Sequence, residues 1–148
     1  MTRVRDLVAY METLAPHNYA EEWDNVGLQV GKLDNEVKKV FLALTPSEKV
    51  LRNAQAKKAD MIITHHPLFF KGINHLSDEL PLGKMVYTLI EQKMTLYSAH
   101  TNLDVAPGGV NDILGEYLDN KSLTLVDGSL ESIDVPCDYI LHGAAPTQ

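Results

Sequence analysis

This 148-residue sequence has few of the features that mark secreted, membrane-bound or disulfide-stabilised proteins. Its single cysteine, Cys137, excludes an internal disulfide and fits a reducing cytoplasm. Charged residues interrupt the apolar ones in the opening MTRVRDLVAYME, so we expect no signal-peptide core. No apolar run approaches the roughly 20 residues that a membrane-spanning helix needs. We therefore expect a cytoplasmic protein with no membrane partner.

Several common functional motifs are also missing. The sequence contains no Walker P-loop, no dinucleotide-binding fingerprint and no G-x-S-x-G nucleophile elbow. Its net charge of −7 argues against binding to nucleic acid, because an acidic surface repels a phosphate backbone. A bound metal ion could reverse that charge at one place, so a phosphorylated small molecule stays possible as a ligand.

The composition, 45% hydrophobic and 22% charged, is that of an ordinary globular domain. Apolar spacing predicts strands that alternate with helices, which is typical of an α/β protein with a mainly parallel or mixed sheet flanked by helices. The expected strands are 27–31, 37–44, 61–64 and 95–99, and the expected helices are 2–15, 48–58, 81–92 and 109–117, the first with Thr2 as a possible N-cap.

This alternation of strand and helix stops near the end of the sequence. Residues 119–148 hold one short apolar run, Leu123–Val126, followed by a polar stretch. We therefore expect an α/β domain over residues 1–125 and an irregular or truncated segment over residues 126–148.

Potential metal ligands follow two of the predicted strands. In MIITHHPL, His65 and His66 follow the strand and precede Pro67, and TLYSAHTNLD carries His100 and Asp104. Ligands of open α/β sheets bind at the carboxyl ends of the strands. Adjacent histidines would point to opposite faces within a strand, but at a strand end, entering the turn at Pro67, both imidazoles can face one cavity.

We predict that His65, His66 and Asp104 bind divalent metal, with His100 as a possible partner that orients a ligand. Two imidazoles and a carboxylate suit Zn²⁺, Fe²⁺, Mn²⁺ or Ni²⁺ without choosing among them. Asp104 could bind one ion or bridge two, in which case His65 and His66 would each hold a different ion. The alternative is that these histidines are ordinary surface or capping residues.

Other notable residues receive structural interpretations. Trp23, the only tryptophan, is expected in the core or an interface. Asp24 and Asn25 could reach the metal cavity, but closing a turn is the favoured interpretation. Gly108-Gly109 could bind an anion at a helix N-terminus, although a tight turn with positive φ is favoured. Cys137 is expected to be inert, and no role is assigned to His17, His75 or His142.

Three longer motifs resemble the Nif-three-like family, whose members are often named GTP cyclohydrolase I type 2 homologues. They are EWDNVGLQVG (Glu22–Gly31), THHPLFFKGI (Thr64–Ile73) and YSAHTNLDVAPGGVNDILGEYL (Tyr97–Leu118). Their order and spacing agree with the family over roughly residues 1–125.

The resemblance implies an α/β fold with two divalent metal ions between two related halves, and a homo-oligomer, commonly a hexameric ring. His65, His66 and Asp104 match the metal ligands of the family's first half, and His100 a histidine beside the site. Two departures stand out. Thr45 occupies a position where the family usually has Asp, and the family's later His-x-x-x-Glu ligand pair is absent, since His142 is followed by GAAP.

Two functions are compatible with these residues. The first is a metal-dependent hydrolase that acts on a nucleotide-like or phosphorylated small molecule, because a pair of divalent ions activates water and stabilises an oxyanion. The second is a non-catalytic metal-binding scaffold or regulatory partner. A fold with no metal at all would require the strand-end histidines to be coincidental.

Overall fold

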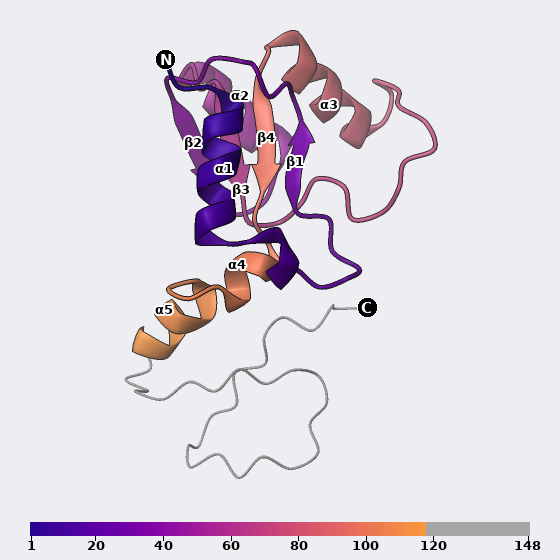
Figure 1. Ribbon diagram of the computed structural model, residues 1–148. Helices are drawn as coiled ribbons and strands as arrows, with labels where there is room; N and C mark the ends of the chain where they lie inside the picture. The colour runs from indigo at the N-terminus through magenta and orange to yellow at the C-terminus, as the bar shows by residue number, and fades with distance from the viewer. Residues whose placement is uncertain (118–148) are drawn as a thin grey trace.

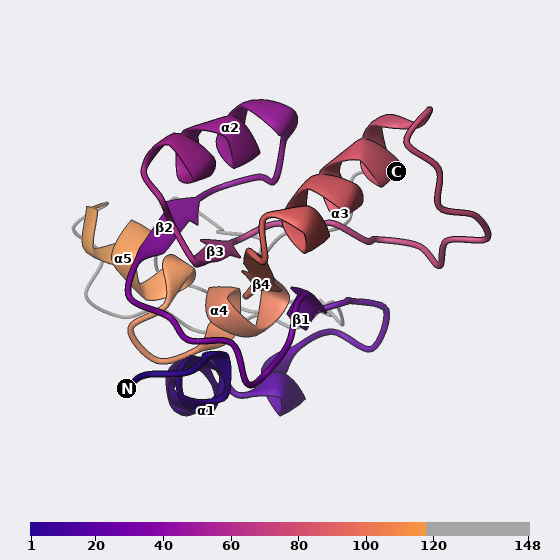
Figure 2. The same ribbon diagram turned by 90° about the horizontal axis from the view of Figure 1, so that it is seen from above.

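The computed structural model describes residues 1–117 and has one mixed sheet between layers of helices (Figures 1 and 2). The strands are β1 (Gly27–Val30), β2 (Val40–Ala43), β3 (Met61–Thr64) and β4 (Thr95–Ser98), in the order β1-β4-β3-β2. β2, β3 and β4 run parallel, and β1 lies antiparallel to β4. The predicted α/β class with a mainly parallel or mixed sheet is confirmed.

Helices cover both faces of the sheet. Helix α1 (Val4–Leu14) lies on one face, and α2 (Glu48–Ala56) and α3 (Pro81–Glu91) lie on the other (Figure 2). The helical spacing of apolar residues explains each layer: Leu51 and Leu89 pack from α2 and α3 against Ile62 and Leu96 of the strands. On the opposite face, residues of α1 pack with Met61 and Tyr97. The central strands β3 and β4 are therefore buried from two sides, as is usual in a parallel sheet, whereas the edge strand β2 is partly exposed.

Two short helices lie beyond the carboxyl ends of the parallel strands. Helix α4 (Thr101–Val105) follows β4 almost at once, and α5 (Val110–Tyr117) follows α4 (Figure 1). Helix α4 was not predicted from the sequence. Gly108 between them has a φ of +71°, which confirms the predicted tight turn, and a side chain at Gly109 would collide with the Leu103 carbonyl oxygen at 2.0 Å.

Two details differ from the sequence-based expectations. Thr2 is not the N-cap of α1: that position belongs to Arg3, while the Thr2 carbonyl accepts a hydrogen bond from the Val37 backbone at 2.9 Å. Trp23 is not a core residue either, since 46% of it is exposed. The segment between α1 and β1 contains a short 3₁₀ helix, His17–Tyr19.

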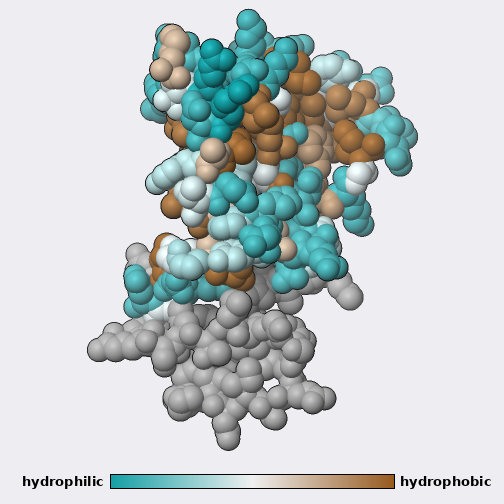
Figure 3. All heavy atoms as spheres, viewed as in Figure 1, coloured by the Kyte–Doolittle hydropathy of each residue, from teal (hydrophilic) through white to brown (hydrophobic). Residues whose placement is uncertain are grey.

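On the face seen in Figure 3, apolar residues gather over α3 and β1, and hydrophilic residues surround them. Within residues 1–117, no helix is long and apolar enough to cross a membrane. The proposed boundary at residue 125, the segment 126–148, Leu123–Val126, Cys137 and His142 lie outside the described residues.

Candidate metal centre

The register between two parallel strands brings the predicted histidines together. Thr64 of β3 pairs with Ser98 of β4, so both strands end at the same level of the sheet. His65 and His66 follow directly after Thr64, and His100 comes two residues after Ser98. One ring nitrogen from each of His65, His66 and His100 lies within 4.8 Å of the others. These three side chains could hold a metal ion.

Asp104 reaches the same place from α4. Its Oδ1 lies 3.4 Å from Nε2 of His65, and its side chain is only 8% exposed. Its Oδ2 is buried and has no hydrogen-bond partner among the described residues. A buried carboxylate oxygen without a partner is costly, and a cation is the kind of group that would compensate it. The arrangement therefore fits a metal ligand.

Each histidine makes a hydrogen bond through Nδ1, which leaves Nε2 as the remaining ring nitrogen. His65 Nδ1 donates to the Ala99 carbonyl at 3.0 Å, and His66 Nδ1 pairs with the Thr45 hydroxyl at 2.6 Å. His100 Nδ1 lies 3.0 Å from Asp24 Oδ1. A carbonyl and a carboxylate can only accept, so the neutral forms of His65 and His100 carry the proton on Nδ1 and leave Nε2 free to bind a metal ion.

Asp24 is a buried anchor for His100 rather than only a turn residue. Its backbone does form a turn, donating to the Glu21 carbonyl at 2.9 Å, but its side chain is 0% exposed. Besides His100, its carboxylate accepts from the Thr101 backbone at 3.1 Å and the Thr101 hydroxyl at 2.5 Å. The favoured sequence interpretation of Asp24 was therefore incomplete, because the partners lie more than 70 residues later in the chain.

The protonation of the site follows from burial and charge. Burial lowers the pKa of His66, and the neighbouring His65 and His100 lower it further, which favours the neutral imidazole that a metal requires. Burial raises the pKa of Asp104, against the opposing effect of His65. Burial also acts to raise the pKa of Asp24, but hydrogen bonds from Thr101 and His100 outweigh it, so this pKa lies below its usual value.

Hydrogen bonds also hold the strand ends together. The hydroxyls of Thr64 and Ser98 both donate to the His66 carbonyl, at 2.8 and 3.3 Å, and the Ala99 backbone donates to the Thr64 carbonyl at 3.0 Å. Asn102 supports the next turn, accepting from the His100 backbone at 2.9 Å and donating to the Ala15 carbonyl at 2.7 Å. The backbone that carries the histidines is therefore fixed on both sides.

Comparison with known proteins assigns this chain to a family. The family model for Duf34/NIF3 (NGG1p interacting factor 3) matches residues 2–135. The chain belongs to the Duf34/NIF3 family. This confirms the resemblance drawn from the three motifs, and the match extends beyond the 1–125 stretch that carries them.

Relatives of the Duf34/NIF3 family share sequence and fold with this chain. A GTP cyclohydrolase 1 type 2 homolog of Listeria innocua is 42% identical over 122 residues, which are 82% of this chain and 33% of the relative. One from Methanocaldococcus jannaschii is 42% identical over 115 residues, which are 77% of this chain and 46% of the relative. The chain thus spans between a third and a half of these relatives.

Solved structures of the family agree with this fold. Reduced HcgD from Methanocaldococcus jannaschii is 40% identical with a TM-score of 0.75, and the match covers 80% of this chain and 47% of that one. A Bacillus cereus protein related to NIF3 is 38% identical with a TM-score of 0.75, and the match covers 79% of this chain and 32% of that one.

The role of Asp24 can be tested by Asp24→Asn. The amide keeps an oxygen for His100 but turns an N–H₂ group toward the Thr101 donors, so His100 loses its fixed orientation. We expect the affinity for Zn²⁺, measured by competition with a chromophoric chelator, to fall roughly 10- to 100-fold. Asp78→Asn, at an exposed position, is the matched control and should bind as wild type. Equal affinities for all three proteins would contradict the role.

Proposed function

We propose that this chain carries ligands for two divalent metal ions of a metal-dependent hydrolase that acts on a nucleotide-like or phosphorylated small molecule. The observation that supports it most is the convergence of His65, His66 and His100 beside the unpartnered oxygen of Asp104. The name of the curated relatives, GTP cyclohydrolase 1 type 2 homolog, supports a nucleotide as the substrate class. The metal is Zn²⁺, Fe²⁺, Mn²⁺ or Ni²⁺, all of which accept this donor set.

The proposed roles follow from the contacts of each side chain. His65 and His66 would each hold one ion through Nε2, and Asp104 would hold one or both ions through its carboxylate. Divalent ions in such a site supply Lewis acidity and activate water for hydrolysis. The protein contributes orientation: Ala99 holds the proton on Nδ1 of His65, Asp24 holds it on Nδ1 of His100, and Thr45 fixes the ring of His66.

The proposed number of ions, two, rests on the resemblance to the family, because the three histidine nitrogens, which lie within 4.8 Å of one another, would also fit a single ion.

Metal content tests the proposed ligands. Protein purified without chelator should contain about two divalent ions per chain if His65 and His66 each hold one. The double variant His65→Ala, His66→Ala should lose this metal, as measured by inductively coupled plasma mass spectrometry. His75→Ala removes an exposed loop histidine and should keep it. Equal metal in wild type and the double variant would refute the assignment.

Turnover separates the hydrolase from the alternative, a non-catalytic metal-binding scaffold. We expect metal-loaded protein to hydrolyse GTP, as measured by chromatography of the products. Asp104→Ala should abolish the reaction, because the carboxylate that anchors the metal is lost. Asp78→Ala, a change at an exposed acidic residue, should retain the activity. Full metal content without turnover of nucleotides would favour the scaffold.

We also propose that the chain works as a homo-oligomer, a hexameric ring by resemblance to its family. Strand β2 supports association because it forms an edge of the sheet and exposes Val40 and Leu42 by 37% and 73%, and Leu44 directly after it is 66% exposed. An edge strand with exposed apolar side chains invites pairing with another chain.

Sedimentation velocity tests this assembly. Wild-type protein should sediment as a species larger than one chain, and Leu42→Glu should shift it toward the monomer because a charge disfavours burial of the edge strand. Leu33→Glu places the same charge at another exposed leucine, in the loop before β2, and should leave the assembly intact. A wild-type protein that sediments as a monomer at all concentrations would disprove the proposal.

A further inference from the structure

Two exposed aromatic side chains flank the buried His100. The ring centroid of Trp23 lies 6.2 Å from that of His100, and the centroid of Phe70 lies 5.7 Å from it, with interplanar angles of 77° and 86°. His100 is only 7% exposed, but Trp23 and Phe70 are 46% and 54% exposed. Two large aromatic rings therefore stand half in solvent at the border of the histidine cluster.

Hydrogen bonds between two loops hold these rings in position. Asn25, two residues after Trp23, donates from Nδ2 to the Phe69 carbonyl at 2.7 Å. The Phe69 backbone donates to Gln29 Oε1 at 3.4 Å, and Gln29 Nε2 donates back to the Asn25 carbonyl at 2.9 Å. Asn25 and Gln29 thus join the loop before β1 to the loop after β3. A binding surface fixed in advance loses little entropy when a ligand arrives.

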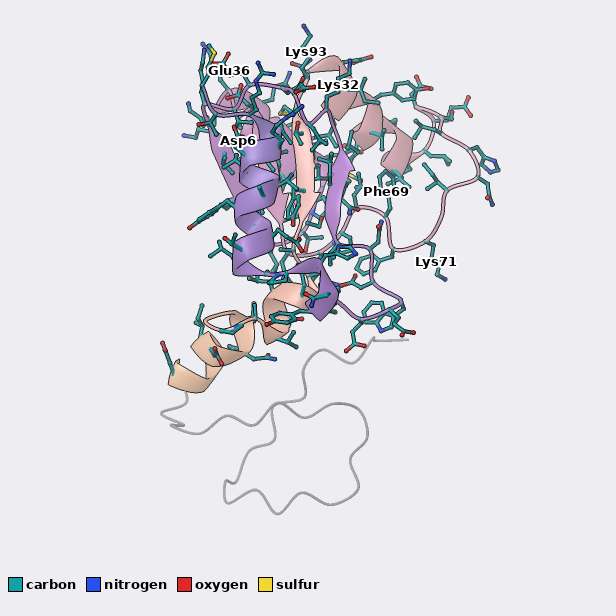
Figure 4. All side chains as sticks on the ribbon, viewed as in Figure 1. Asp6, Lys32, Glu36, Phe69, Lys71 and Lys93 are labelled. Atoms are coloured by element: carbon teal, nitrogen blue, oxygen red, sulfur yellow. The ribbon has the colours of Figure 1, made fainter. Side chains whose placement is uncertain are left out.

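The charges around these rings favour recognition of a ring rather than of a phosphate. Glu21 and Glu22 precede Trp23 and are exposed, which would repel an anion. Lys71 follows Phe70, but its side chain points away from the sheet in Figure 4. The other labelled charged residues of that view lie at the opposite end of the sheet: Asp6, Lys32, Glu36 and Lys93.

We propose that Trp23 and Phe70 form an aromatic subsite that binds a planar heteroaromatic ring of the substrate beside His100. Stacking on exposed aromatic faces supplies the affinity, as in proteins that bind bases through Trp, Tyr or Phe. The remainder of the substrate then extends toward His65, His66 and Asp104, a part of the inference that rests on the proposed function. Trp23 and Phe70 thereby select for an aromatic ring, and the metal ligands act on the group attached to it.

The subsite can be tested directly because Trp23 is the only tryptophan of the chain. Guanosine, which has the ring but no phosphate, should quench the fluorescence of wild-type protein in a saturable manner, with or without added Zn²⁺. Inorganic triphosphate, which has no ring, should leave the fluorescence of metal-free protein unchanged. A response to triphosphate but not to guanosine would overturn the proposal.

Variants of Phe70 separate ring binding from a structural role. Phe70→Ala should weaken guanosine binding roughly 5- to 150-fold, the range found when stacking residues are removed, and Phe70→Tyr should retain it. Tyr87→Ala, at a 40% exposed aromatic residue on α3, is the matched control. Unfolding by urea checks that each variant is folded. Wild-type affinity in a folded Phe70→Ala protein would refute the subsite.

Metal content distinguishes this inference from the proposed function. Phe70→Ala should bind as much Zn²⁺ as wild type, since Phe70 offers no metal ligand. Loss of guanosine binding with normal metal content supports the subsite. If wild type binds no metal yet guanosine still quenches Trp23, the metal assignment fails and the subsite stands.

Discussion

The parallel register of β3 and β4 is the constraint on which the rest of the site depends. Because Thr64 pairs with Ser98, the chain leaves both strands at the same level, and the Ala99 backbone ties the two exits together through the Thr64 carbonyl. The carbonyl of Ala99 also accepts a hydrogen bond from Nδ1 of His65. A slip of one residue would turn these side chains to the other face of the sheet and separate the histidines.

The second level of organisation lies in the groups that hold the imidazoles. Asp24 is the most important of them, since its enclosed carboxylate accepts from His100 and twice from Thr101 and so links the loop before β1 to the start of α4. β1 runs antiparallel to β4, so the residues that precede it arrive at the carboxyl edge of the parallel strands. The antiparallel strand thus serves the site by delivering Asp24, Trp23 and Asn25 to it.

Much of this architecture could be predicted from the sequence. Apolar periodicity located β3 at its observed bounds and the ends of the other strands and of α1, α2, α3 and α5 within a few residues, because each strand is short, apolar and flanked by turn residues. The positions of the histidines directly after β3 and β4 in the sequence predicted a shared cavity, because the carboxyl ends of parallel strands lie at one edge of the sheet.

What sequence patterns did not show depends on contacts between distant residues. The five-residue helix α4 is too short to have a helical period of its own, and it is held by the Asn102 and Thr101 contacts. The hydrogen bond of Thr45 to His66 joins residues 21 positions apart, and nothing near Thr45 in the sequence indicates it. Trp23 was expected in the core or an interface, and its exposure excludes the core alternative, since the fold places it at the border of the site.

The most direct test of the account is a long-range ¹H–¹⁵N correlation spectrum of the histidine side chains, in metal-free protein and after addition of Zn²⁺. We expect neutral His65 and His100 to carry the proton on Nδ1, and Zn²⁺ to shift the Nε2 resonances of His65, His66 and His100 but not those of His75. A proton on Nε2 of His65 or His100, or a spectrum that Zn²⁺ leaves unchanged, would contradict a metal site organised by Ala99 and Asp24.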